Sequence, residues 1–170
     1  PVGVLWFAAT EGGVVRVVWG MDVRRFVSVL RGDGFRLGEA GVKIIDSVKT
    51  ELMEYFDGVR RSFSVPVDLR VEGFRRRVLE AVAKIPFGEV RSYRDVAASI
   101  GKPGAYRAVG NAVARNPVPI IIPCHRVVKS DSTIGYYGGD ESMKAWLLRH
   151  EGLKLLPEMA TSPALLKIVK

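Results

Sequence analysis

The only cysteine of the chain, Cys124, is followed directly by His125 and Arg126, so a nucleophile, a base and a cation are adjacent. One cysteine cannot form an internal disulfide, so Cys124 is either a small buried apolar residue or a reactive thiol. Residue type alone favours the inert residue. The neighbours favour the reactive thiol, because positive charge stabilises a thiolate and lowers the pKa of the thiol. Pro123 also stiffens the backbone directly before it.

A partner for the histidine must come from elsewhere in the chain. Adjacent side chains in extended backbone point to opposite faces, so His125 would need a water molecule to take a proton from Cys124. A carboxylate would orient the imidazole, and Glu151 is the candidate. Position alone favours the other interpretation, in which Glu151 is a surface residue at a helix end before Gly152.

Short motifs surround the cysteine in the second half of the chain. They are Gly88–Val90, Ser92-Tyr93, Arg107–Gly110, Asn116–Pro119, Pro123–Val128 and Trp146–Gly152. Together they resemble the O6-alkylguanine-DNA alkyltransferases, also called methylated-DNA–protein-cysteine methyltransferases. The resemblance implies a DNA repair enzyme that rotates O6-alkylguanine out of duplex DNA and transfers the alkyl group irreversibly to Cys124. Each molecule would act once, without a cofactor.

The resemblance also implies roles for individual residues around the thiol. In the family a cysteine–water–histidine–glutamate relay activates the thiol, and Cys124, His125 and Glu151 match its positions. Asn116 matches an asparagine that ties the recognition helix to the active-site strand. Tyr93 matches a tyrosine that promotes rotation of the nucleotide and hydrogen-bonds the departing guanine. The catalytic residues expected are Cys124, His125, Glu151, Asn116, Tyr93 and Lys144, the last assisting Tyr93.

Arg107 matches an arginine that inserts where the base has left the stack, on a helix that enters the minor groove in related proteins. The sequence alone does not choose between the grooves. In the loop over residues 130–139, Tyr137 would lie against the base and the backbone N–H of Gly138 would hold the guanine oxygen. Many relatives have serine at the position of Gly138. The expected DNA-binding residues are Tyr93, Arg94, Lys102, Arg107, Ala108, Gly110 and Ser130, and the expected pocket residues are Val113, Val127, Tyr137 and Gly138.

Two short helices should present these residues. Ser92 and Asp95 have the spacing of a capping box, and the helix that they begin should stop at Gly101. Pro103 is expected near the first position of the next helix, which runs to Ala114. This outline predicts a helix-turn-helix, although many packed helix pairs share it. The small residues of the second helix suit either tight packing inside the domain or close approach to DNA.

Further helices are expected over residues 74–82 and from near Asp140, and Leu153, Leu155, Leu156, Leu165 and Leu166 make the C-terminal tail amphipathic. Residues 1–70 predict strands over 2–8 and 14–19, helices over 23–30 and 42–56, and an edge strand over 63–67. We therefore expect an α+β protein with a small α/β scaffold domain over 1–70 and the DNA-binding and active-site domain over 71–170. The resemblance implies that the first is ribonuclease-H-like and the second mostly helical and winged-helix-like.

Basic residues are concentrated in the second domain. Residues 1–70 hold ten Lys or Arg against nine Asp or Glu, whereas residues 71–170 hold sixteen against nine. Such an excess suits double-stranded DNA, although a generally basic surface would give the same count. Some family members bind a structural zinc in the first domain, but no Cys or His precedes Cys124, so no metal is expected.

We expect no membrane span, no secretory signal and a monomer in the reducing cytoplasm, which the single cysteine suits. The absence of Gln and the presence of two Asn weakly indicate a thermophilic source. Three other functions remain as alternatives. A non-catalytic alkyltransferase-like damage sensor would lack the acceptor cysteine, a helix-turn-helix regulator would not need it, and a cysteine hydrolase would turn over.

Overall fold

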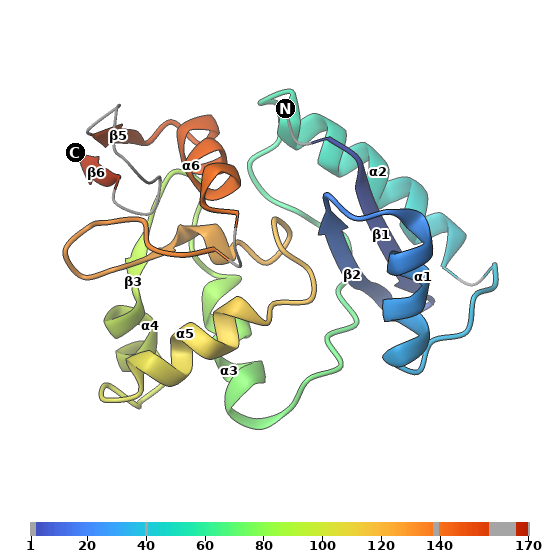
Figure 1. Ribbon diagram of the computed structural model, residues 1–170, viewed down its shortest axis with the longest axis horizontal. Coiled ribbons are helices and arrows are strands. Elements are labelled where there is room, and N and C mark those ends of the chain that lie inside the picture. The colour runs from blue at the N-terminus through green and yellow to red at the C-terminus, as the bar shows by residue number, and fades with distance from the viewer. Residues whose placement is uncertain (1–2, 40, 138–139, 157–165, 170) are drawn as a thin grey trace. The chain divides into compact units, whose positions relative to one another are not determined.

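The computed structural model describes residues 3–39, 41–137, 140–156 and 166–169, and contacts between residues divide the chain into two units. The first unit contains Pro1–Arg70 with the short segment Pro117–Pro119, and the second contains Val71–Asn116 and Ile120–Lys170 (Figure 1). Helices and small two-stranded sheets make up both units. A mixed helix-and-strand protein is therefore confirmed.

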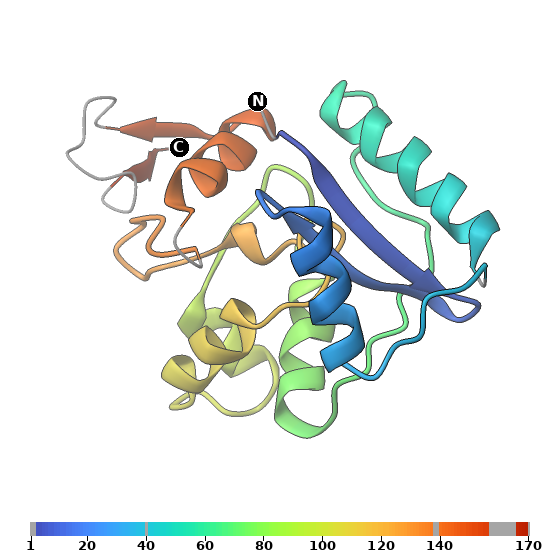
Figure 2. The same cartoon turned by 45° about the vertical axis from the view of Figure 1, so that its right-hand side comes forward.

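The first unit is built on an antiparallel hairpin of β1 (Leu5–Thr10) and β2 (Gly13–Trp19). Gly13 is needed at the turn, because a Cβ on it would lie 2.6 Å from the carbonyl oxygen of Pro66. Helices α1 (Val23–Gly32) and α2 (Val42–Phe56) lie on either side of the hairpin (Figure 2). Their apolar faces were predicted by helical spacing, and the buried core of this unit includes Val14, Phe26, Leu30, Val48, Leu52 and Tyr55.

The edge strand expected over residues 63–67 is wrong, since only Val67 pairs, in an isolated parallel bridge with Val14. The physical reason is the buried carboxylate of Glu51. It accepts the backbone N–H groups of Ser64 at 2.8 Å and Val65 at 3.4 Å, which are therefore not available to a sheet. Pro66 has no N–H to offer. A side chain from α2 thus replaces the strand partner.

The second unit contains the predicted helix pair, with α4 (Tyr93–Ser99) and α5 (Tyr106–Ala114) packed on each other and on α3 (Gly73–Val82). The capping box of Ser92 and Asp95 is formed, with bonds of 3.1 and 2.8 Å. Pro103 is not at the first position of α5, because that helix begins at Tyr106 after Ala105. The turn between the helices is longer than expected.

Short elements connect the helix pair to the rest of the unit. Strand β3 (Arg91–Ser92) pairs in parallel with β4 (Val127–Val128), which follows a 3-10 turn, η1 (Cys124–Arg126). Helix α6 (Glu141–His150) begins at Asp140, whose side chain accepts the N–H of Met143 at 3.0 Å. Strand β5 (Lys154–Leu156) then pairs antiparallel with β6 (Lys167–Val169). The described residues of the predicted amphipathic tail therefore include two paired strands. Leu165, one of the leucines of that tail, lies outside the described residues.

Helices in the described part of the chain are all too short or too polar to span a bilayer. Within the same residues, no three His, Cys, Asp or Glu side chains are grouped so that they could hold a metal ion.

Candidate active site

The cysteine is aimed by a constrained segment. Ile120 is buried and has φ of 74°, a left-handed conformation that costs a β-branched residue about 1–2 kcal/mol. Two residues later the Ile122 carbonyl accepts the side-chain N–H of Asn116 at 2.8 Å. This bond ties the end of α5 to the backbone directly before Cys124, as the resemblance predicted.

Cys124 begins η1 and is 3% exposed, with its Sγ 3.5 Å from the hydroxyl of Tyr137. Burial raises the pKa of the thiol, and hydrogen bonds from Asn116 and Tyr137 and the charge of Lys144 offset part of that effect. The expectation that His125 and Arg126 lower this pKa is wrong for the free protein. Their side chains are directed to a carboxylate instead, so the resting thiol is protonated at neutral pH.

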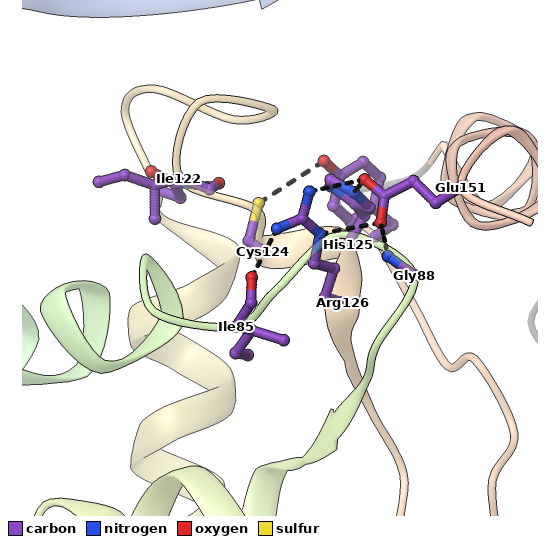
Figure 3. Close-up of polar contacts among 9 residues, drawn as sticks. Ile85, Gly88, Ile122, Cys124, His125, Arg126 and Glu151 are labelled. Carbon is purple, nitrogen blue, oxygen red and sulfur yellow. Dashed lines mark hydrogen bonds and ion pairs between the residues drawn. The ribbon is translucent and has the colours of Figure 1, made fainter. Parts of the chain in front are cut away.

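That carboxylate is Glu151, which ends α6 and is 4% exposed (Figure 3). His125 Nε2 lies 2.8 Å from its Oε1, and Arg126 donates from Nη2 to Oε1 at 2.8 Å and from Nε to Oε2 at 2.9 Å. The backbone N–H of Gly88 adds a bond of 3.2 Å to Oε2. Glu151 is therefore no surface residue, and sequence reasoning overlooked the paired role of Arg126, although a charged residue inside an apolar run was a signal for it.

The protonation states of this cluster follow from its geometry. Burial would raise the pKa of Glu151, but the bonds from His125 and Arg126 lower it to about 2, so the carboxylate is ionised. Burial lowers the pKa of His125, so the imidazole is neutral at pH 7. Its Nε2 must carry the hydrogen that faces the carboxylate, which leaves Nδ1 with a lone pair. That Nδ1 is buried without a hydrogen-bond partner among the described residues.

Lys144 is 1% exposed and donates from Nζ to the Val127 carbonyl at 2.7 Å, while the same Nζ lies 5.8 Å from the centre of the Tyr137 ring. Burial lowers its pKa to about 8. The expected partner of Lys144 was Tyr93, whereas the structure places its ammonium group on Val127, close enough to act on the charge of Cys124.

Tyr93 begins α4 beside the same thiol, and burial and then the charge of a Cys124 thiolate raise the pKa of its phenol. A Cβ added to Gly110 would lie 3.9 Å from the Tyr93 ring, so the two are in ordinary contact range. Residue 110 of α5 therefore faces the Tyr93 ring, and a Cβ there would fit without displacing it. The structure accordingly brings Asn116, Tyr93, Lys144 and Tyr137 around Cys124, with His125 and Glu151 paired beside them.

The expected DNA-binding residues other than Tyr93 and Gly110 are on the surface. They are Arg94, Lys102, Arg107, Ala108 and Ser130. The guanidinium of Arg94 lies 5.4 Å from the centre of the Tyr106 ring, a contact that joins α4 to α5. Of the expected pocket residues, Val113 and Val127 are buried, and Gly138 lies outside the described residues.

The fold and site describe a mixed helix-and-strand protein with a buried cysteine beside a paired histidine and glutamate. Comparisons with known proteins identify its class. Residues 73–153 match the family model described as 6-O-methylguanine DNA methyltransferase, DNA binding domain. The chain belongs to the methylated-DNA–protein-cysteine methyltransferase family. Membership rests on the Methanosarcina barkeri methyltransferase of that name, which is 43% identical over 109 residues, covering 64% of this chain and 69% of the relative.

Two further relatives extend the comparison. The constitutive methylated-DNA–protein-cysteine methyltransferase of Bacillus subtilis is 47% identical over 104 residues, 61% of this chain. The match spans 63% of the length of that relative. A crystal structure of Mycobacterium tuberculosis OGT in complex with DNA has a TM-score of 0.74 and 36% identity, covering 89% of this chain and 88% of that one.

Proposed function

We propose that this protein repairs O6-alkylguanine in double-stranded DNA by transferring the alkyl group to its own Cys124. The observation that carries the proposal is the buried thiol itself. Its sulfur has Tyr137, Asn116 and Lys144 around it, and the adjacent imidazole is held by an ionised carboxylate. Membership of the methyltransferase family supports the same chemistry.

A buried thiol cannot reach a base inside a duplex, so the damaged nucleotide must rotate out of the stack. Rotation costs roughly a few kcal/mol, and weaker pairing of a damaged base reduces that cost. The pair α4 and α5 would act as a helix-turn-helix in which α5 enters the minor groove, with Arg107 inserted in place of the base. Arg94, Lys102 and Ser130 would hold the phosphate backbone, and Ala108 with Gly110 would let α5 approach it closely.

In the transfer step, the Cys124 sulfur attacks the alkyl carbon, an S–C bond forms and the bond from that carbon to guanine O6 breaks. The thiol proton passes through one water molecule to His125 Nδ1, and Glu151 stabilises the resulting imidazolium. Tyr93 hydrogen-bonds the departing guanine and donates a proton to it, so the guanine leaves as a neutral base. The Tyr93 phenolate then regains a proton through solvent from the His125 imidazolium, so the proton lost by the thiol balances the one gained by guanine. A thioether has no easy route back, so each molecule reacts once.

The pocket for the rotated base would be formed by the remaining expected residues. Tyr137 and Val113 would line it, the carbonyl of Val127 would accept from the exocyclic amine, and the N–H of Gly138 would hold O6. Since Lys144 already occupies one lone pair of the Val127 carbonyl, the base would use the second.

The non-catalytic damage sensor is not favoured, because such proteins lack the acceptor cysteine that this chain has. We also propose that the first unit is a ribonuclease-H-like scaffold, that the second is winged-helix-like, and that the protein works as a monomer in the cytoplasm of a thermophile.

Mass spectrometry after incubation with duplex DNA containing O6-methylguanine tests the proposal. We expect one added methyl group on Cys124, with activity exhausted at one equivalent of substrate. Cys124→Ala should bind the same DNA and gain no mass. Unmodified wild-type protein that still binds would instead support a sensor or a regulator, and continued turnover would support a hydrolase.

A further inference from the structure

Strand β6 lies between two other segments of the described chain. On one edge β6 pairs antiparallel with β5, Leu155 being opposite Ile168. On the other edge the N–H of Ile168 donates to the Ser132 carbonyl at 3.0 Å, and the N–H of Ile134 donates to the Leu166 carbonyl at 2.9 Å. These two bonds flank an antiparallel bridge of Thr133 with Lys167. Figures 1 and 2 show β5 and β6 beside the loop that precedes α6.

Side chains seal the same junction. Leu166 is buried in a cluster with Ile134 and Leu155, and Leu148 and Ala145 of α6 complete it. Ile134 and Leu148 are fully buried, so this cluster is a core and not a surface contact. The C-terminal segment therefore holds residue 134 by backbone bonds and by apolar packing at once.

Residue 134 is three positions before the group that touches the thiol. Tyr137 lies 3.5 Å from Cys124 Sγ, and its N–H donates to Glu141 Oε1 of α6 at 3.0 Å. At the start of the same loop, Asp131 accepts the N–H of Thr133 at 2.9 Å. The segment 129–137, here called the pocket wall, is thus fixed by α6 at one end and by β6 in its middle.

We propose that residues 166–169 act as a latch that positions the pocket wall and so sets how tightly the pocket binds an alkylated guanine. The inference rests on the proposed function. Cys124, His125, Glu151 and Asn116 take no part in the bonds between β6 and the pocket wall. Loosening the latch should therefore weaken binding of the base and leave the rate of the chemical step nearly unchanged.

Leu166→Ala and Ile168→Pro test the latch by different means. The first removes buried apolar contact with Ile134, and the second removes the N–H that donates to Ser132. Leu156→Ala is the matched control, because Leu156 is in the neighbouring strand β5 and is 47% exposed. The measurement is the rate of Cys124 alkylation by a free O6-benzylated guanine base over a range of concentrations, which separates the half-saturating concentration from the limiting rate.

If the pocket wall is ordered for one-tenth of the time in a latch variant, the half-saturating concentration rises about tenfold. We expect this rise in Leu166→Ala and Ile168→Pro, with limiting rates within about twofold of wild type, and no change in Leu156→Ala. Unchanged half-saturation in both latch variants would overturn the proposal, and so would a fall confined to the limiting rate.

Hydrogen exchange keeps this test separate from that of the proposed function. Faster exchange of amides in residues 129–137 in Leu166→Ala but not in Leu156→Ala supports the latch, even if wild type never accepts an alkyl group. Equal exchange of these amides in wild type, Leu166→Ala and Leu156→Ala refutes the latch, even if wild type transfers the alkyl group normally. If Ile168→Pro does not fold, the half-saturating concentration and the hydrogen exchange of Leu166→Ala decide whether the latch exists.

Discussion

Glu151→Gln is the substitution whose effect the structure defines most sharply. The Glu151 carboxylate accepts hydrogen bonds from Arg126, His125 and the backbone of Gly88. Glutamine keeps one oxygen but places an NH₂ group among donors, so at least one N–H of Arg126 loses its acceptor. It also leaves the buried guanidinium without a counter-charge, which is the costly way to break a buried ion pair.

Two independent routes give a similar magnitude. Removing one partner of a buried pair costs about 3–5 kcal/mol. The pKa of Glu151 is lowered from 4.5 to about 2, and at 1.36 kcal/mol per unit this shift contributes about 3 kcal/mol to stability at pH 7. For a protein of this size, about 3 kcal/mol is about 6–12 °C in Tm.

The dependence on pH has a definite sign. Because the folded-state pKa is depressed, the stabilisation is complete above the unfolded-state value of 4.5 and is lost as pH falls toward about 2. Urea unfolding of wild type and Glu151→Gln should therefore differ by about 3 kcal/mol at pH 7 and by about 1 kcal/mol at pH 3.

The same substitution in an Arg126→Met background provides the control. Without the guanidinium, the cost of Glu151→Gln should fall by more than half, because the unpaired buried charge is gone. The reasoning is refuted if Glu151→Gln costs under about 1 kcal/mol at pH 7. It is equally refuted if the cost does not change with pH or with the Arg126→Met background.

Substitutions at three further positions test other parts of the site. Arg107→Ala should slow methyl transfer from duplex DNA by about tenfold and leave transfer from single strands unchanged, because stacking contacts are worth about 1–3 kcal/mol per base; equal duplex rates would exclude insertion. Lys144→Met should slow alkylation of Cys124 by iodoacetamide at pH 7, where Lys144 carries its charge and the ammonium group favours the thiolate; an unchanged rate at pH 7 would show that its charge does not reach the sulfur. Ile120→Ala and Ile120→Gly should both be destabilised in thermal unfolding, because the lost burial of about 2–5 kcal/mol exceeds the strain relieved. Glycine should nevertheless be the more stable of these two by about 1 kcal/mol, because φ is 74° there; the ordinary order, with alanine more stable, would argue against strain.

Local patterns predicted most of the helices correctly, because their causes lie within a few residues. The capping box of Ser92 and Asp95 places the start of α4, and the apolar spacing of Val78, Leu79 and Val82 defines the buried face of α3. The same local reasoning failed for residues 63–67. Nothing in that stretch reveals that Glu51, more than ten residues away, takes up its N–H groups.

The site divides in the same way. Residue types singled out Cys124 and His125, and the resemblance to a known family added Glu151 and the expectation of alkyl transfer to the thiol. The identity of the cation beside the thiol was not predictable, because it depends on which side chains the fold directs toward the sulfur. Arg126, next but one to Cys124 in sequence, points to Glu151, while Lys144 from α6 supplies the cation.

The C-terminal residues show the same contrast at longer range. Their leucine spacing indicated only an amphipathic tail, whereas in three dimensions β6 bonds to a loop more than thirty residues earlier in the chain. Hydrophobic periodicity reports which face of an element is buried, and it carries no information about the partner that buries it. Long-range strand pairing and the burial of charged groups depend on tertiary packing. Only the three-dimensional structure therefore reveals the direction of the thiol pKa shift, the hydrogen bonds of Glu151 and the anchoring of the pocket wall.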